Sequence, residues 1–333
     1  MILPQMAVRN DNLLRLLLAY SASHRARSLH HPEPAVRIAM WTQGIFGNLR
    51  TALDNPHEIV SDVNLAAAIM LTSLEIISPK AFGVAIPWQH HLETAREMVA
   101  ARGGPVRMRT VARGNKVTSF LWSWYAYLDV VGSLSGARSS SMSSAWVDDS
   151  VDHEDDYDID CVLGYTRKCM RLLAKVAELR RAAYNHRVVQ QANVNMSENI
   201  RPSDHIIDQG KQLILEFRTS LSKPARPCTH LQSSGEAAFQ WDSIEMAATN
   251  EMFHWAGIVH LQRCVIGKPS THSDVQSAVR EIFGALHKIR KGSSAEGCSL
   301  FPMFTAGCEV EDGLLREVVI ERIRGLEMTG LMQ

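Results

Sequence analysis

The stretch HEIVSDVNLAAAIMLTSLEIISP, residues 57–79, decides the fold class of this chain. Its apolar residues surround the helix axis instead of following one face, and a helix of this kind is buried on most of its circumference. The apolar part is shorter than the ~20 residues that a membrane-spanning helix needs. The stretch therefore predicts a core helix of a globular protein.

The rest of the chain also carries the helical period. Apolar residues recur every three or four positions, and no segment shows the alternation of a half-buried strand. Helices are expected over residues 12–29, 35–56, 57–79, 88–104, 116–134, 161–185, 203–221, 236–267, 273–292 and 313–333. We therefore predict a single all-α domain spanning residues 1–333, with roughly eight to ten helices.

Several residues are suited to begin or end these helices. Asn12, Ser203 and Ser273 have side chains that can accept a hydrogen bond from a helix N-terminus, so we expect them to be N-caps. The paired glycines at 103 and 104 suit a left-handed C-cap, and Asn55-Pro56 closes the helix that precedes it.

The helical pattern is interrupted between residues 136 and 158, and again by a short loop over residues 223–235. The first segment is rich in serine and then in acid, with eight Asp or Glu residues from Asp148 to Asp160. We predict a disordered insertion or a solvated loop there. Its mixture of acidic and apolar residues is also compatible with a disordered activation segment.

The overall composition narrows the class of protein. The chain has 333 residues, 46% of them apolar, and a formal net charge of zero, so no global basic field marks a nucleic-acid binder. The six cysteines include no CxxC pair, and their spacing fits neither a zinc site nor a small disulfide scaffold. No secretion signal is recognisable. We expect an intracellular, reduced protein that does not bind membranes.

An enzymatic alternative comes from Asp148, Asp149 and Asp152. Their DDxxD spacing is the one with which all-α terpenoid synthases hold Mg²⁺ and a diphosphate, and carboxylates suit this hard cation. Ser277 and Glu281 fit a second metal motif of that class, in which Ser273 replaces the expected Asn or Asp. A short acidic match is, however, easily produced by chance within an acid-rich loop.

Other chemically active residues are better explained by packing. Cys308 follows a glycine, as nucleophilic cysteines often do, but the acids after it would raise the pKa of its thiol. We expect Gly307 and Cys308 to form a packing point of small residues. The pairs His90 with His91 and His254 with His260 lack metal-binding spacing, so helix packing is expected for them.

Five segments, in order, resemble the fungal-specific transcription factor domain that follows the zinc binuclear cluster in sterol-regulator-like activators. The most specific is SLFPMFTAGCEV, residues 299–310, which is similar to the family's "fPlf-aGcE" pattern. The other four are LLRLLLAYSASHRARS (13–28), WQHHLETAREMVAARGG (88–104), FLWSWYAYLDVVGSLSG (120–136) and IDCVLGYTRKCMRLLAKVAEL (159–179). Thr94 departs from the glycine that is common at its position.

This resemblance implies an all-α regulatory domain in the nucleus, without enzymatic activity or a cofactor. It also implies an apolar groove for a small lipophilic effector, which we place at Phe301, Met303, Phe304 and Gly307. The expected partners are the transcription machinery or another regulator, with a homodimer also possible. The family's zinc cluster is missing, so we expect contact with DNA to be indirect or to need an N-terminal cluster encoded elsewhere.

Overall fold

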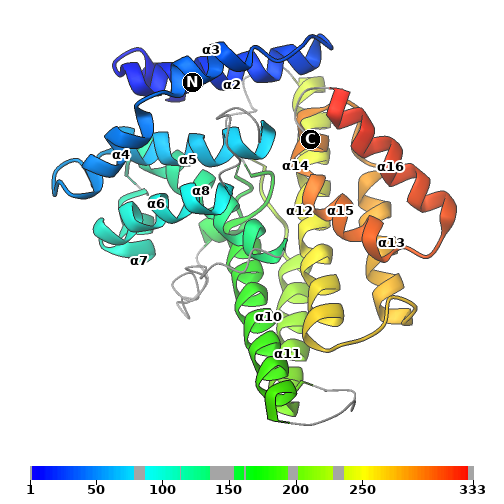
Figure 1. Ribbon diagram of the computed structural model, residues 1–333. Coiled ribbons are helices and arrows are strands. Elements are labelled where there is room, and N and C mark those ends of the chain that lie inside the picture. The colour runs from blue at the N-terminus through cyan, green and yellow to red at the C-terminus, as the bar shows by residue number, and fades with distance from the viewer. Residues whose placement is uncertain are drawn as a thin grey trace. The chain divides into compact units, whose positions relative to one another are not determined.

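The computed structural model describes residues 2–78, 87–112, 114–135, 154–160, 163–193, 202–227 and 236–328. Every regular element in these ranges is a helix, and they contain no β-strand (Figure 1). The predicted all-α class is confirmed. The described helices are more numerous than the eight to ten expected.

Contacts divide the chain into two compact units. The N-terminal unit consists of residues 1–129 together with 324–333, and the C-terminal unit of residues 130–323. The boundaries fall within two helices, α8 (Lys116–Leu134) and α16 (Gly313–Met328). A single domain over the whole chain therefore stays a prediction.

The N-terminal unit is built around α5 (Asp62–Ile77), which packs against α2, α4 and α6. The helices of this unit besides α5 and α8 are α1 (Ile2–Ala7), α2 (Asp11–Ser28), α3 (Ala35–Thr42), α4 (Ile45–Leu53), α6 (Trp88–Ala101) and α7 (Gly104–Ala112). Every residue of α5 from Leu65 to Glu75 is buried, so the sequence prediction of a core helix is confirmed.

Two ion pairs connect α6 to its neighbours. The Arg96 Nε donates a hydrogen bond to Asp129 Oδ1 of α8 at 2.8 Å, and the Asp129 side chain is fully buried. At the C-cap of α6, Arg102 pairs with Asp62 of α5 at 2.7 Å. Because the first pair is removed from water, its loss would leave an uncompensated charge inside the protein.

The ends of the helices in the N-terminal unit agree only in part with the sequence prediction. Asn10, not Asn12, is the N-cap of α2, because its side chain accepts from Leu13 N. The helix expected over residues 35–56 is interrupted at Gly44, whose φ of +83° places it in the left-handed region. Gly103 and Gly104 both have positive φ, as predicted, but a further helix, α7, begins at once.

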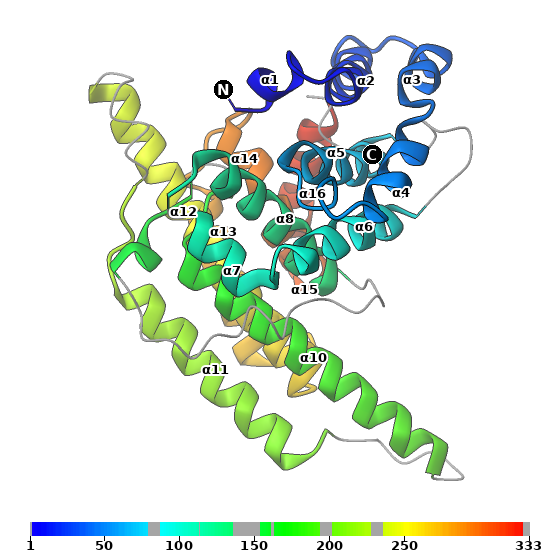
Figure 2. The ribbon, with the colours of Figure 1, turned by 90° about the vertical axis from the view of Figure 1, so that its left-hand side faces the viewer.

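The C-terminal unit surrounds α12 (Glu236–His260), which packs against helices on several sides. Its neighbours are α10 (Arg167–Asn193), α11 (Asp204–Ser222), α13 (Ser273–Leu286), α14 (Ser294–Cys298) and α15 (Leu300–Glu309). The long helices α10 and α11 run side by side (Figures 1 and 2), and Lys175 pairs with Glu216 between them at 3.1 Å.

Of the two serines predicted to be N-caps in this unit, one is an N-cap and the other is not. Ser203 is the N-cap of α11, as predicted. Ser273 is not a cap: the preceding His272 accepts from Asp274 N, and Ser273 is the first residue of α13. The helix expected over residues 236–267 ends in a π-helical turn, η3 (Leu261–Val265).

The predicted disordered insertion is wrong at its C-terminal end. Residues 136–153 lie outside the described residues, but Glu154–Tyr157 forms a short 3-10 helix, η1. Its Asp156 is buried and pairs with Arg171 of α10 at 2.8 Å. Arg226 also pairs with Asp158 at 2.7 Å. These arginines give the acidic residues counter-charges, which composition alone did not reveal.

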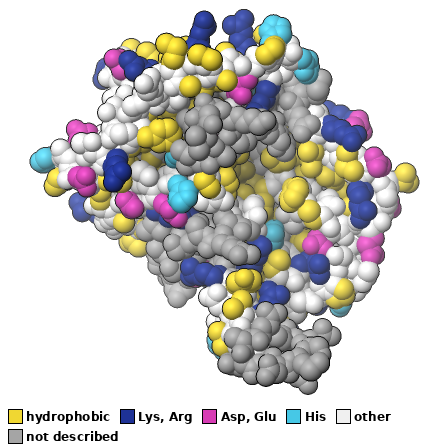
Figure 3. Space-filling model, viewed as in Figure 1, with side chains coloured by type: hydrophobic (Ala, Val, Ile, Leu, Met, Phe, Trp, Pro, Cys, Tyr) yellow, Lys and Arg dark blue, Asp and Glu magenta, His cyan; other side chains and the backbone are white. Residues whose placement is uncertain are grey.

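Apolar side chains are also exposed on part of the N-terminal unit. Figure 3 shows hydrophobic and basic side chains over α2 and α3, at the top of the view. Of the eight residues of α3, only Ile38 and Thr42 are buried. Most of α3 therefore faces solvent.

Candidate functional site

The predicted ligand-binding residues lie on α15, and their environments differ. Phe301 and Met303 are buried, whereas Phe304 is 61% exposed. The Phe301 ring stacks on the His260 ring, with 5.4 Å between centroids, and lies 5.8 Å from the Phe253 ring. Phe301 and Met303 thus belong to a packed core, and their role in ligand binding stays a prediction.

Gly307 marks a close approach between α15 and α16. A Cβ atom placed at Gly307 would lie 2.9 Å from Cγ1 of Val319, which is closer than side chains normally come. Cys308 is exposed, so the predicted packing point consists of Gly307 without Cys308. Although Cys308 is exposed, partial desolvation and then the charge of Glu309 raise the pKa of its thiol, which disfavours the nucleophilic thiolate.

The two histidines of α12 have structural contacts, as predicted. The His254 ring forms two hydrogen bonds: its Nδ1 donates to Asn250 O at 2.7 Å, and its Nε2 is bonded to the Ser220 hydroxyl at 2.9 Å. Burial lowers the pKa of His254 to about 4. Burial and then the charge of Arg180 lower the pKa of His260 to about 3. Both imidazoles are therefore neutral near pH 7.

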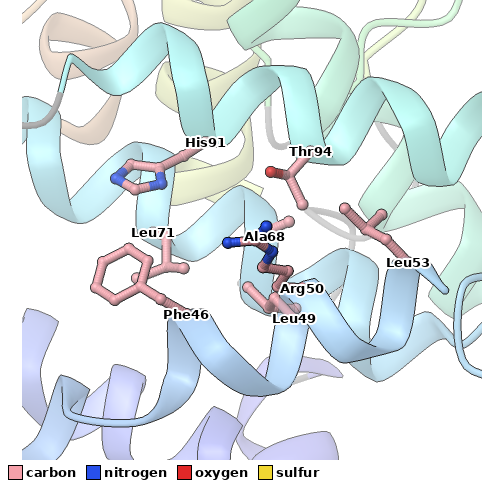
Figure 4. Close-up of a pocket in the computed structure, with 8 residues that line it drawn as sticks. All are labelled: Phe46, Leu49, Arg50, Leu53, Ala68, Leu71, His91 and Thr94. Atoms are coloured by element: carbon pink, nitrogen blue, oxygen red, sulfur yellow. The ribbon is translucent and has the colours of Figure 1, made fainter.

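A pocket of about 230 Å³ lies in the N-terminal unit, between α4, α5 and α6 (Figure 4). Its walls are mainly apolar, and its polar side chains come from α4 and α6. It is lined by Phe46, Leu49, Arg50, Leu53, Ala68, Leu71, His91 and Thr94. Figure 4 shows the α4 side chains pointing toward His91 and Thr94 on α6. Ala68 and Leu71 are the α5 residues that line this space.

The pocket combines a neutral interior with a charged edge. His91 is buried, and its ring centroid lies 5.3 Å from that of Phe46. Burial and then the neighbouring His90 lower the pKa of His91 to about 4, so this histidine is uncharged near pH 7. Arg50 is exposed and carries the only full charge among the lining residues at that pH.

Nothing in the sequence analysis pointed to this pocket. Its residues come from three helices and have no motif spacing, since Phe46, Leu49, Arg50 and Leu53 simply follow the helical period of α4. The one usable signal was the run of small residues from Ala66 to Ala68 in α5, of which Ala68 lines the pocket.

The residues of the enzymatic alternative are not brought together by the described structure. Asp148, Asp149 and Asp152 lie outside the described residues. Ser273, Ser277 and Glu281 are exposed on the surface of α13. Within the described ranges, no group of three or more His, Cys, Asp or Glu side chains is arranged to hold a metal ion. No described helix has the length and apolar character needed to cross a membrane.

An all-α fold with buried, structurally bonded histidines and an apolar pocket is compatible with a regulatory domain. Comparison with protein families makes the class definite: the model of the fungal specific transcription factor domain matches residues 1–332. The chain belongs to this family, and the resemblance seen in the sequence is confirmed. Searches of curated proteins and of solved structures give no match. The family supports a regulatory role in fungal transcription.

Proposed function

We propose that this chain is an effector-binding regulatory domain of a fungal transcription regulator and that it acts in the nucleus. The family match over residues 1–332 carries this proposal. The pocket between α4, α5 and α6 supports effector binding, since ligand sites are typically concave and mainly apolar, with a few polar groups that orient the ligand. The predicted groove at Phe301, Met303, Phe304 and Gly307 is a second candidate for the effector.

In the proposed mechanism the effector shifts the population of two conformations of the domain. A ligand changes such an equilibrium only by the difference between its affinities for the two states. Ligand contacts with α4 and α6 would favour the arrangement in which these helices stand at the distance that the ligand requires. The partners that respond would be the transcription machinery, another regulator or a second copy of this chain.

A fusion experiment tests this function. The whole chain is joined to an unrelated DNA-binding domain and expressed in a fungal cell with a reporter gene that carries the matching operator. We expect reporter expression to differ at least severalfold from that with the DNA-binding domain alone. A fluorescent fusion of the chain should also accumulate in the nucleus.

The control is a fusion of equal length whose fold is disrupted by Leu71→Asp, because a buried unpaired carboxylate in α5 is strongly destabilising. Equal reporter expression from the intact fusion, the disrupted fusion and the DNA-binding domain alone would contradict the regulatory proposal.

A further inference from the structure

The chemistry of the pocket specifies its ligand more narrowly than the proposed function does. We propose that the pocket between α4, α5 and α6 binds a small amphipathic carboxylate, with the apolar part of the ligand between α4 and α5 and the carboxylate on Arg50. This inference rests on the proposed effector-binding function and names the chemical class of the effector.

The size of the cavity limits the ligand. At about 230 Å³ it lies below the roughly 300–1,000 Å³ of pockets for drug-sized molecules, so it suits a ligand of on the order of ten non-hydrogen atoms. The fused rings of a sterol are much larger than this. The pocket therefore favours a short acyl chain or a single-ring acid over a sterol.

The walls determine where the apolar part of the ligand lies. Leu49 on α4 and both Ala68 and Leu71 on α5 are buried, and they offer only hydrocarbon to the cavity. The Phe46 ring closes one side together with the imidazole of His91 (Figure 4). Because His91 is neutral near pH 7, it adds no positive charge to the interior. An uncharged hydrocarbon chain is therefore the group that fits these walls.

The edge of the pocket determines the polar end. Arg50 is exposed at the edge, and within the described ranges its guanidinium forms no ion pair with a carboxylate, although Asp54 lies one helical turn further on. Thr94 lines the same pocket from α6, and its hydroxyl donates to the backbone oxygen of His90 at 3.4 Å. Because a hydroxyl has only one hydrogen to donate, the donors left for the ligand are those of Arg50, whose planar guanidinium matches a carboxylate especially well.

This arrangement distinguishes a carboxylate from a neutral amphiphile of the same shape. A primary amide has the length of the carboxylate but lacks its charge, so it would keep the contacts with the walls and lose the ion pair with Arg50. An exposed ion pair contributes up to about fivefold in affinity, and salt weakens it. Octanoate and octanamide therefore form a suitable pair of probes.

The test is isothermal titration calorimetry of the full chain with octanoate and with octanamide at low ionic strength. We expect octanoate to bind about fivefold more tightly than octanamide, and the difference to shrink as salt is added. Arg50→Gln should weaken octanoate binding about fivefold and leave octanamide unchanged, whereas Arg50→Lys should restore part of the difference. Ala68→Leu should abolish binding of both probes, because it fills the cavity.

Arg37→Gln is the matched control, since Arg37 is also an exposed arginine of the N-terminal unit but does not line the pocket. Equal affinities of octanoate and octanamide for the unmodified chain would overturn the carboxylate assignment, as would an unchanged octanoate affinity in Arg50→Gln. Failure of both probes to bind would overturn the site itself. None of these results decides the proposed regulatory function, which the reporter experiment tests separately.

Discussion

The helices α5 and α12 are the central helices of their units, but the side chains described beside them differ in size. In α5, the buried residues Ala66, Ala67 and Ala68 are small, and a pocket of about 230 Å³ lies next to the helix. In α12, the Phe253 ring lies 4.2 Å from the ring of Tyr165 and 5.8 Å from that of Phe301. The described pocket thus lies beside small residues of α5, whereas aromatic rings pack against one another at α12.

The largest effects are expected where both units bury an arginine–carboxylate pair. Arg96 with Asp129 and Arg322 with Glu296 are such pairs, and Arg322 also donates to the backbone oxygens of Leu286 and Ile289. Replacing either arginine by Met should lower the free energy of unfolding by about 3–5 kcal/mol. Arg322→Met should have the larger effect, since it also leaves two carbonyl groups without a donor. Urea unfolding followed by circular dichroism measures both.

Lys211→Met is the control for these variants, because its pair with Asp208 is largely exposed and such pairs contribute little. A loss below about 1 kcal/mol in Arg96→Met would mean that the pair is not removed from water as the structure describes.

The second prediction concerns pH and the α5 region. Glu75 is buried, no described group bonds to its Oε2, and burial raises its pKa to about 7. Since the folded state holds this proton more tightly than the unfolded state, Glu75 should reduce stability as pH rises from about 4.5 to 7. Glu75→Gln should therefore raise the free energy of unfolding at pH 8, by at most about 3 kcal/mol.

Buried histidines give the free energy of unfolding the opposite pH dependence, and their effect is the same in the unmodified chain and in Glu75→Gln. Burial lowers the pKa of His91, in the N-terminal unit, to about 4, and it lowers the pKa of His254, in the C-terminal unit, to the same value. Stability should thus decrease as pH falls from about 6.5 to 4, in the unmodified chain and in Glu75→Gln alike. Urea unfolding between pH 4 and 8 gives both slopes; an unchanged slope above pH 5 in Glu75→Gln would refute a buried carboxyl at this position.

The third prediction tests the difference in space directly. Ala256 of α12 and Ala68 of α5 are both fully buried, but only Ala68 lines the described pocket. Ala256→Leu should destabilise the protein by roughly 1–3 kcal/mol through overpacking, whereas Ala68→Leu should cost less than about 1 kcal/mol. Thermal and urea unfolding of the two variants measure these changes. Equal losses would indicate that the pocket is closed in solution.

These two regions also show what could be predicted from the sequence. The helical class and the burial of α5 followed from periodicity, because the number of apolar faces on a helix is a local property of the sequence. The packing of the Phe301 ring against Phe253 and His260 could not be predicted from the sequence, since it depends on which helices become neighbours. The pocket was missed for the same reason, because an empty space is defined by the side chains of three helices.

The smallest changes in the free energy of unfolding are expected from alanine substitutions at two glycines, one packed closely against a neighbouring helix and one without a neighbour. Gly307→Ala in α15 should lower stability by about 1 kcal/mol, since the new Cβ would lie 2.9 Å from Cγ1 of Val319. Gly47→Ala in α4 meets no atom within 4 Å, so the better helix propensity of alanine should raise stability by about 0.5–1 kcal/mol. The opposite signs are measurable by urea unfolding. If Gly307→Ala were also stabilising, α15 and α16 would not approach each other closely at this glycine, and the C-terminal unit would have space of its own.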